Sequence, residues 1–322
     1  MVPWLDALRG RLTDVTGEEV RLSWFLRMDP QVALAYGSPT YAVDAYPGLF
    51  ERLMTRGDAL GVHPHMGRWD DPSQRWIVDY ESEAWVEECV QTSVEGHRAA
   101  FGISPAQQRF GAGWWNRSAM ALLQRLGIRF DLTAEPGEVY GTPVSSSDVL
   151  WLGRFPDFRN VPQRPYHPSQ SDPARPEEGS PERLWEIPLT SGKRVAPSTA
   201  VRSTAARLRH PVRTVRNAVR RGRRAASGEA TLRRTLDLMA MWQAWKSPED
   251  FWRSVERRLS DLEFPYLAFA TRSDVPINRR HYERVRGILE HLLTDRMATR
   301  VVFTTPEDAL SRLGFRMVPE TA

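Results

Sequence analysis

The feature that most constrains the fold is an alternation of short apolar runs with amphipathic stretches along the first 131 residues. Apolar side chains recur every three or four positions in the amphipathic stretches, which is typical of helices, while the short runs are typical of buried strands. The helices are expected at 3–12, 46–56, 81–101 and 117–126, and the strands at 21–27, 59–62, 108–110 and 128–131. This order predicts a parallel α/β architecture, either a barrel or a doubly wound sheet.

The rest of the chain continues the pattern after an interruption. Residues 135–182 are rich in Pro, Gly, Ser and Asp, which predicts a long irregular excursion with at most one pair of strands. Strands are then expected at 184–189, 264–271 and 300–304, and helices at 236–260, 279–294 and 306–312. We expect a single domain over 1–322, interrupted by a basic insertion at 193–235.

Composition indicates a soluble globular protein. Of the 322 residues 41% are hydrophobic, which is enough for a sizeable core. Cys89 is the only cysteine, so the chain needs no oxidising compartment. The N-terminus lacks a basic region followed by an apolar run, and no stretch of about twenty apolar residues occurs. The expected location is therefore cytoplasmic, with a peripheral membrane contact as a further option.

The positive charge is concentrated in one segment. Residues 193–234 contain 13 Lys and Arg against one acid, whereas the remaining chain has a net charge of −8. We weigh three interpretations of the basic part at 199–234: a solvated insertion, a surface for an anionic membrane or acidic glycan, and a nucleic-acid contact. Nucleic acid is the least favoured partner, because Pro211 breaks the helix and no aromatic side chains lie between the arginines.

Two histidines follow the strand at 59–62 in the segment GVHPHMGRWD. Loops at the carboxyl ends of parallel strands carry active sites in α/β folds, so His63 and His65 are candidate metal ligands. Their side chains point to opposite faces of an extended chain unless it turns at Pro64. A solvated or hydrogen-bonded pair therefore stays open as the alternative. Asp29, which ends the strand at 21–27, is either a third ligand or the turn-forming Asp of an Asp-Pro pair.

Four segments together resemble the polysaccharide deacetylases with NodB homology, which are metal-dependent amidohydrolases on a distorted (β/α) barrel. They are GDALGVHPHMGRWD, RFGAGWWN, LLQRLGIRFDLTAEPG, and RPYHPSQSD followed by LWEIPLTSG. The resemblance covers most of 1–190 and, more loosely, 237–312. It implies a hydrolase that removes an N-acyl or O-acyl group from a sugar in surface-polysaccharide metabolism, with a divalent metal ion such as zinc.

The resemblance also implies roles for individual residues. His63 matches a histidine ligand of the metal, and His65 and Asp29 are the candidates beside it. Arg109 matches the arginine that orients a catalytic carboxylate. Asp274 is the acid expected near the last catalytic position. The expected substrate-binding residues are Trp69, Trp114, Trp115, Tyr166 and Arg272.

Departures from the family pattern leave the activity open. The usual first strand, which ends in an Asp pair, is absent before the helix at 3–12, so the chain resembles a truncated or degenerate member. Gly67 stands where the second histidine ligand is usual, and no histidine follows the strand at 264–271. A catalytically inactive glycan-binding relative is therefore the alternative to an enzyme. An adaptor built around 199–234 is a third hypothesis.

Overall fold

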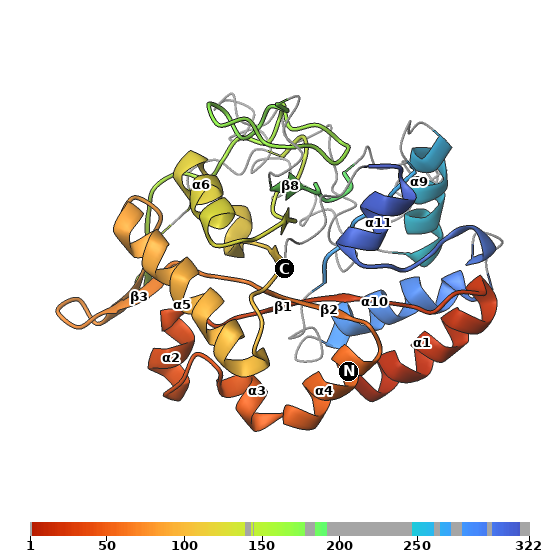
Figure 1. The fold of residues 1–322 in the computed structure, drawn as a ribbon, viewed down its shortest axis with the longest axis horizontal. Coiled ribbons are helices and arrows are strands. Elements are labelled where there is room, and N and C mark those ends of the chain that lie inside the picture. Colours follow the sequence, from red (N-terminus) through yellow and green to blue (C-terminus); the bar gives the residue numbers. More distant parts are fainter. Residues whose placement is uncertain are drawn as a thin grey trace, which may run out of the picture. The chain divides into compact units, whose positions relative to one another are not determined.

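The computed structural model describes residues 2–138, 143, 145–177, 184–191, 247–260, 265–271, 279–294 and 298–315 (Figure 1). The chain separates into two compact units. The first contains Met1–Thr190, Glu263–Ala268 and Leu293–Ala322, and the second contains Ser191–Leu262 and Phe269–Leu292. The basic segment lies outside the described residues, so the expectation of one domain with an insertion stays a prediction.

A five-stranded parallel sheet forms the centre of the first unit. Its strands follow one another in chain order: β1 (Ser23–Leu26), β2 (Ala59–Val62), β5 (Gln107–Gln108), β6 (Phe130–Asp131) and β8 (Trp185–Glu186). Consecutive parallel strands require crossover connections, which are mostly helical in this unit. The mixed α/β class with a parallel sheet is therefore confirmed.

The sheet does not close into a barrel within the described residues, because β1 and β8 are its two edges. One backbone hydrogen bond continues beyond each edge: Arg21 donates to the carbonyl of Phe303, and Thr190 donates to that of Ala268. The segments expected as strands at 264–271 and 300–304 thus lie beside the sheet without regular strand pairing. A 3₁₀ turn, η5 (Ala298–Arg300), ends at the first residue of the segment 300–304.

The helices of the first unit are α1 (Val2–Thr16), α2 (Pro30–Tyr36), α3 (Tyr41–Ala45), α4 (Pro47–Thr55), α5 (Glu83–Phe101), α6 (Arg117–Arg125) and α11 (Pro306–Arg312). The longest, α5, begins where Ser82 caps the backbone of Trp85 and ends at Gly102, which has a left-handed conformation. Apolar side chains of α5 and α6 form the largest core cluster together with Phe110 and Leu184. The sequence pattern did not predict α2 and α3.

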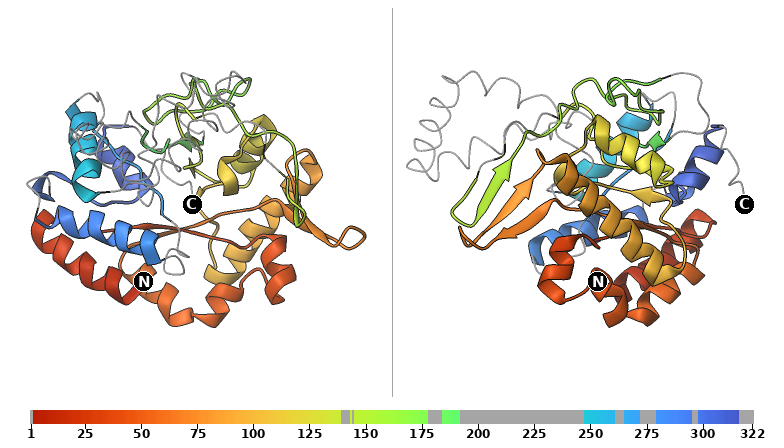
Figure 2. Two further views of the ribbon diagram at one scale, coloured as in Figure 1. Left: turned by 180° about the vertical axis from the view of Figure 1, so that it is seen from behind. Right: turned by 60° about the vertical axis from the view of Figure 1, so that its left-hand side comes forward.

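The first unit also has a second sheet, of three strands, whose β3–β4 hairpin the sequence pattern did not predict. It contains β3 (Gly67–Asp70), β4 (Arg75–Asp79) and β7 (Val149–Leu152) (Figure 2, right). β3 and β4 pair as an antiparallel hairpin, and β7 adds parallel to β4. The hairpin begins directly after the His-Pro-His segment, where only a loop was expected.

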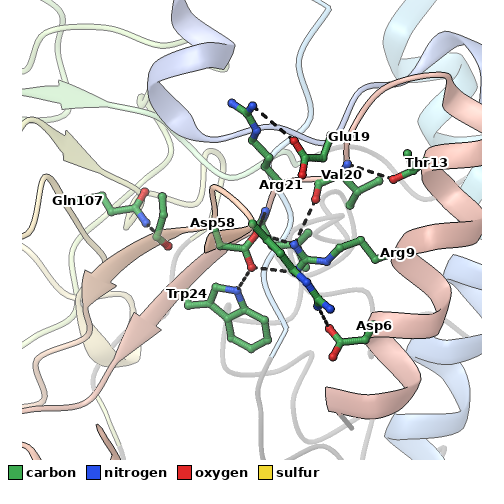
Figure 3. Close-up of polar contacts among 12 residues, drawn as sticks. Asp6, Arg9, Thr13, Glu19, Val20, Arg21, Trp24, Asp58 and Gln107 are labelled. Atoms are coloured by element: carbon green, nitrogen blue, oxygen red, sulfur yellow. Dashed lines mark hydrogen bonds and ion pairs between the residues drawn. The ribbon is translucent and has the colours of Figure 1, made fainter. Parts of the chain in front are cut away.

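A buried ion pair joins α1 to the parallel sheet (Figure 3). Both terminal nitrogens of Arg9 donate to the carboxylate of Asp58, and each of these hydrogen bonds is 2.7 Å long. The same carboxylate accepts the backbone N–H of Leu22 at 2.9 Å and the indole N–H of Trp24 at 2.7 Å. Four donors thus compensate the loss of water around Asp58, and the pair holds α1 against the start of β1 and β2.

The second unit is described through two helices, α9 (Pro248–Ser260) and α10 (Arg279–Leu292). Phe251, Val255 and Ile288 are buried, and the indole of Trp252 donates to the carbonyl of Ile288 at 2.7 Å. None of the helices within the described ranges is long and apolar enough to span a membrane.

Candidate functional site

The two histidines of the His-Pro-His segment face each other. His63 Nε2 and His65 Nε2 are 3.2 Å apart, and the rings meet edge to face. The carbonyl of Pro64, between them, accepts the N–H of Gly111 at 2.9 Å. The segment has left the strand conformation by this point, and the two side chains that an extended strand would have separated meet. The expected position at the carboxyl edge of the sheet is also observed, since β2 ends at Val62.

The hydrogen bonds determine which nitrogen of His63 carries its proton. His63 Nδ1 lies 2.6 Å from the carbonyl oxygen of Arg109, and a carbonyl only accepts. Nδ1 is therefore protonated. Burial, with the nearby charges of His65 and Arg109, lowers the pKa of His63 to about 3, so the ring is neutral near pH 7. Its Nε2 lone pair then accepts the N–H of His65 Nε2.

The two histidines meet some of the requirements of a metal site but do not complete its set of ligands. A metal-bound histidine usually donates its other ring nitrogen to a carbonyl or carboxylate, as His63 does. A tetrahedral zinc ion with Zn–N bonds of about 2.0–2.1 Å holds two nitrogens roughly 3.3 Å apart, which is close to the distance between His63 and His65. However, among the residues that the structure describes, no three His, Cys, Asp or Glu side chains are grouped to hold a metal. The histidines fit such an ion, but the complete ligand set does not.

Asp29 has a structural role in the described residues. Its Oδ1 accepts from Arg27 Nη2 at 2.8 Å and from the backbone N–H of Gln31 at 3.1 Å. Its Oδ2 accepts from Arg27 Nε at 2.9 Å and from the backbone N–H of His65 at 3.2 Å. Asp29 thus caps α2, as the turn-forming alternative expects, and holds the backbone of the His-Pro-His segment. Its metal ligation stays a prediction.

Gly111 leaves room for the imidazole of His65. A Cβ atom at position 111 would lie 2.3 Å from His65 Cδ2 and 2.5 Å from its Nε2. Any side chain at position 111 displaces the His65 ring.

Arg109 follows β5 and pairs with a buried acid, while its catalytic role stays a prediction. The acid is Glu135, whose Oε1 accepts from Arg109 Nη2 at 2.8 Å. Burial raises the pKa of Glu135, although the charge of Arg109 opposes this. Arg109 Nη1 and Glu135 Oε2 have no hydrogen-bond partner among the described residues. Sequence reasoning did not find Glu135, because nothing in its pattern distinguishes it from a loop acid.

Two buried carboxyl groups lie next to this pair and were also missed. Asp131 and Glu186 occupy paired positions on β6 and β8, and both are fully buried. Asp131 Oδ2 and Glu186 Oε2 are buried atoms for which no hydrogen-bond partner is found among the described residues. Burial raises the pKa of both groups, and the neighbouring Asp131 raises that of Glu186 further. The sequence indicates them only by placing one acid in each of two short apolar segments that are expected to be strands.

Most of the expected sugar-binding aromatics are part of the core. Trp114 is 3% exposed and stacks on Tyr80, and Trp115 is 6% exposed and contacts Phe158 edge to face. Their rings are covered by other side chains, so the expectation that they form an open rim is wrong.

The remaining expected residues differ in accessibility. Tyr166 is 4% exposed and donates to the carbonyl of Pro173, so its hydroxyl faces the interior. Trp69 is half-buried on β3, against Trp76 of β4, and is the accessible member of the set. Arg272 and Asp274 lie outside the described residues, and their roles stay predictions.

Comparisons with known proteins give structural similarity at low sequence identity. No family model matches the chain, and no curated protein sequence matches it. A Mycobacterium smegmatis protein provisionally classed as a polysaccharide deacetylase is 14% identical, with a TM-score of 0.32 over 60% of this chain and 51% of that one. The chain thus spans about half the length of that protein. The Puue allantoinase is 13% identical, with a TM-score of 0.46 over 95% of this chain and 70% of that one. The structure is therefore similar to a deacetylase and an allantoinase, at low identity.

Proposed function

We propose that this protein is a deacetylase-like hydrolase that removes an N-acyl or O-acyl group from a sugar of a surface polysaccharide. The observation that carries the proposal is the meeting of His63, His65 and Arg109 at the carboxyl edge of the sheet. His63 and Arg109 are positions at which the sequence motifs resemble those of the deacetylases, and His65 lies beside them. Parallel α/β sheets bind their ligands at this edge.

The described side chains suggest roles in binding. Arg109 Nη1 is a cationic donor without a partner in the described part of the chain, and it suits an acyl or sugar oxygen. Glu135 is the carboxylate that Arg109 orients, and it would hold or accept a proton there. Trp69 would offer an apolar face to a sugar ring.

A divalent metal ion, with zinc favoured by imidazole donors, would be held by His63 and His65. When bound, such an ion polarises a carbonyl or activates water. The described residues provide two nitrogen donors and no third group, so no reaction step through a metal follows from them.

The alternative is a glycan-binding relative that does not hydrolyse its ligand. It is favoured by one specific observation: Asp29, the nearest candidate for a third ligand, is fully occupied by four donors. This alternative retains the fold and the accessible Trp69, and requires only binding.

One experiment separates the two functions. Metal content is measured by elemental mass spectrometry, and acetate release is measured with acetylated amino-sugar oligomers, for the wild type and the variants His63→Gln, His65→Gln and His97→Gln. His97, on α5, is the matched control. Its Nδ1 also lies near a backbone carbonyl, that of Ile103, at a distance of 3.0 Å.

The hydrolase proposal predicts about one metal ion per chain and acetate release, both lost in the first two variants and retained in the third. Oligomer binding without metal or acetate supports the glycan-binding alternative. A wild-type protein with no metal, no acetate release and no oligomer binding would refute both.

A further inference from the structure

A series of hydrogen bonds connects the histidine pair with the buried carboxyl pair. His65 Nε2 is 3.2 Å from His63 Nε2, and His63 Nδ1 is 2.6 Å from the carbonyl of Arg109. The backbone N–H of Phe110 donates to Thr133 Oγ1 at 2.8 Å, and Thr133 Oγ1 donates to Asp131 Oδ1 at 2.5 Å. The bond from His63 Nδ1 is shorter than ordinary N–H···O hydrogen bonds, and the other two bonds to oxygen are within the usual ranges.

The series is continuous because two of its atoms belong to one peptide group. The carbonyl of Arg109 and the N–H of Phe110 are the two ends of the same planar amide, so the hydrogen bond on one end polarises the other. Every donor along the series points in the same direction, from His65 towards Asp131. Thr133 and Phe110 are fully buried, so water does not compete for these bonds.

The acid at the end of the series is a well-defined acceptor. Asp131 Oδ1 also accepts from Gln108 Nε2 at 2.6 Å. Asp131 Oδ1 is thus the acceptor of two buried side-chain donors, Thr133 Oγ1 and Gln108 Nε2.

We propose that Asp131 and Thr133 are positioning residues, which act through the peptide between Arg109 and Phe110 to hold His63 in the Nδ1–H tautomer. In this tautomer the Nε2 lone pair of His63 is directed at His65, where a ligand of the site would bind. The inference deepens the proposed function because it concerns the same histidine, but it needs neither metal nor activity to be tested. Neither residue is expected to touch the substrate.

The test measures the tautomer directly. Histidine ring nitrogens are observed by ¹⁵N–¹H NMR at pH 7.5 in the metal-free protein, for the wild type, Thr133→Val and Thr133→Ser. Valine has nearly the same shape as threonine but leaves the N–H of Phe110 without an acceptor, whereas serine restores the hydroxyl. We expect the ratio of Nδ1–H to Nε2–H tautomers at His63 to fall in Thr133→Val, by roughly the 10–30% of one hydrogen bond that polarisation through the peptide contributes, and to recover in Thr133→Ser.

His97 serves as the internal reference, since its Nδ1 contacts the carbonyl of Ile103 without a comparable series behind it. Its signals should not change in any variant. Should Thr133→Val fail to fold, Thr133→Cys replaces it, because a thiol is a weak acceptor of similar size. Unchanged His63 signals in Thr133→Val or in Thr133→Cys would overturn the inference, and equal shifts at His97 would reduce it to a general loss of structure.

Discussion

His63 Nε2 and His65 Nε2 lie 3.2 Å apart although the two residues follow a strand on which alternate side chains diverge. The irregular backbone around Pro64 makes this possible, and three features stabilise it. Gly111 donates to the carbonyl of Pro64, Asp29 accepts the N–H of His65, and the absence of a side chain at Gly111 admits the ring of His65. The site is therefore assembled by contacts from β1, β2 and β5.

The first prediction concerns the space beside His65. Gly111→Ala should displace the ring, because the new Cβ would lie 2.3 Å from His65 Cδ2. We expect a loss of about 1–3 kcal/mol in the free energy of unfolding, as for other overpacked sites, and loss of any metal bound by the pair. Gly10→Ala in α1 is the control, since a Cβ there has nothing within 4 Å. Equal stability of the two variants in urea would contradict the predicted clash.

Asp29 provides the second prediction. Asn caps helices as well as Asp, so Asp29→Asn should keep α2 intact while removing the charge that pairs with Arg27. The amide nitrogen of Asn only donates, so the variant cannot both cap α2 and accept the N–H of His65, and we expect it to bind less metal than the wild type. Asp29→Ala removes the cap as well and should cost about 1 kcal/mol of stability in urea. Wild-type metal content in the Asn variant would contradict the role of Asp29 in holding His65.

The third prediction concerns the ion pair in Figure 3. Arg9→Met should lower the free energy of unfolding by about 3–5 kcal/mol, because Asp58 is left buried without its cation. Arg312→Met removes the exposed pair between Arg312 and Glu18 and should have little effect. Denaturant titrations compare the two. A large effect of the Arg312 variant, or none of the Arg9 variant, would be inconsistent with the role assigned to burial.

The carboxyl pair gives a prediction on pH. Burial raises the folded-state pKa of Glu186, so the folded protein keeps a proton that the unfolded chain releases above its ordinary pKa of about 4.3. The free energy of unfolding should therefore decrease as pH rises above that value, by at most about 1.4 kcal/mol per pH unit for this one proton. Glu186→Gln retains the acceptor for Ala134 and should flatten the decrease relative to the wild type. If the free energy of unfolding fell equally with pH in the two proteins, Glu186 would not be the group that keeps the proton in the folded state.

The last prediction separates accessible from buried tryptophans. Trp114→Ala should cost about 3–5 kcal/mol of stability, because the ring fills the core between Tyr80 and Phe110. Trp69→Ala should cost about 1 kcal/mol, the loss of its cross-strand contact with Trp76, but should weaken oligosaccharide binding measured by titration calorimetry. Unimpaired binding by the Trp69 variant would remove this residue from the proposed sugar site.

Local patterns predicted most elements of the first unit and two members of the site. The apolar runs located β1 and β2, and the periodic stretches located α1, α4, α5 and α6 to within a few residues. Position at the end of β2 was sufficient to select His63 and His65. The β3–β4 hairpin escaped prediction because its apolar residues, such as Trp69 and Trp76, alternate with charges in a segment too short to distinguish from a loop.

By itself the sequence determined the parallel α/β class and the order of its strands, because hydrophobic periodicity and turn residues are properties of neighbouring positions. Tertiary structure alone decided which side chains meet. Asp131 and Glu186 are neighbours because the registers of β6 and β8 align them. Asp29 became a cap, and Trp114 a core residue, because packing left no open face on either. Contacts between residues distant in sequence depend on strand register and burial, and neither is encoded in a local pattern.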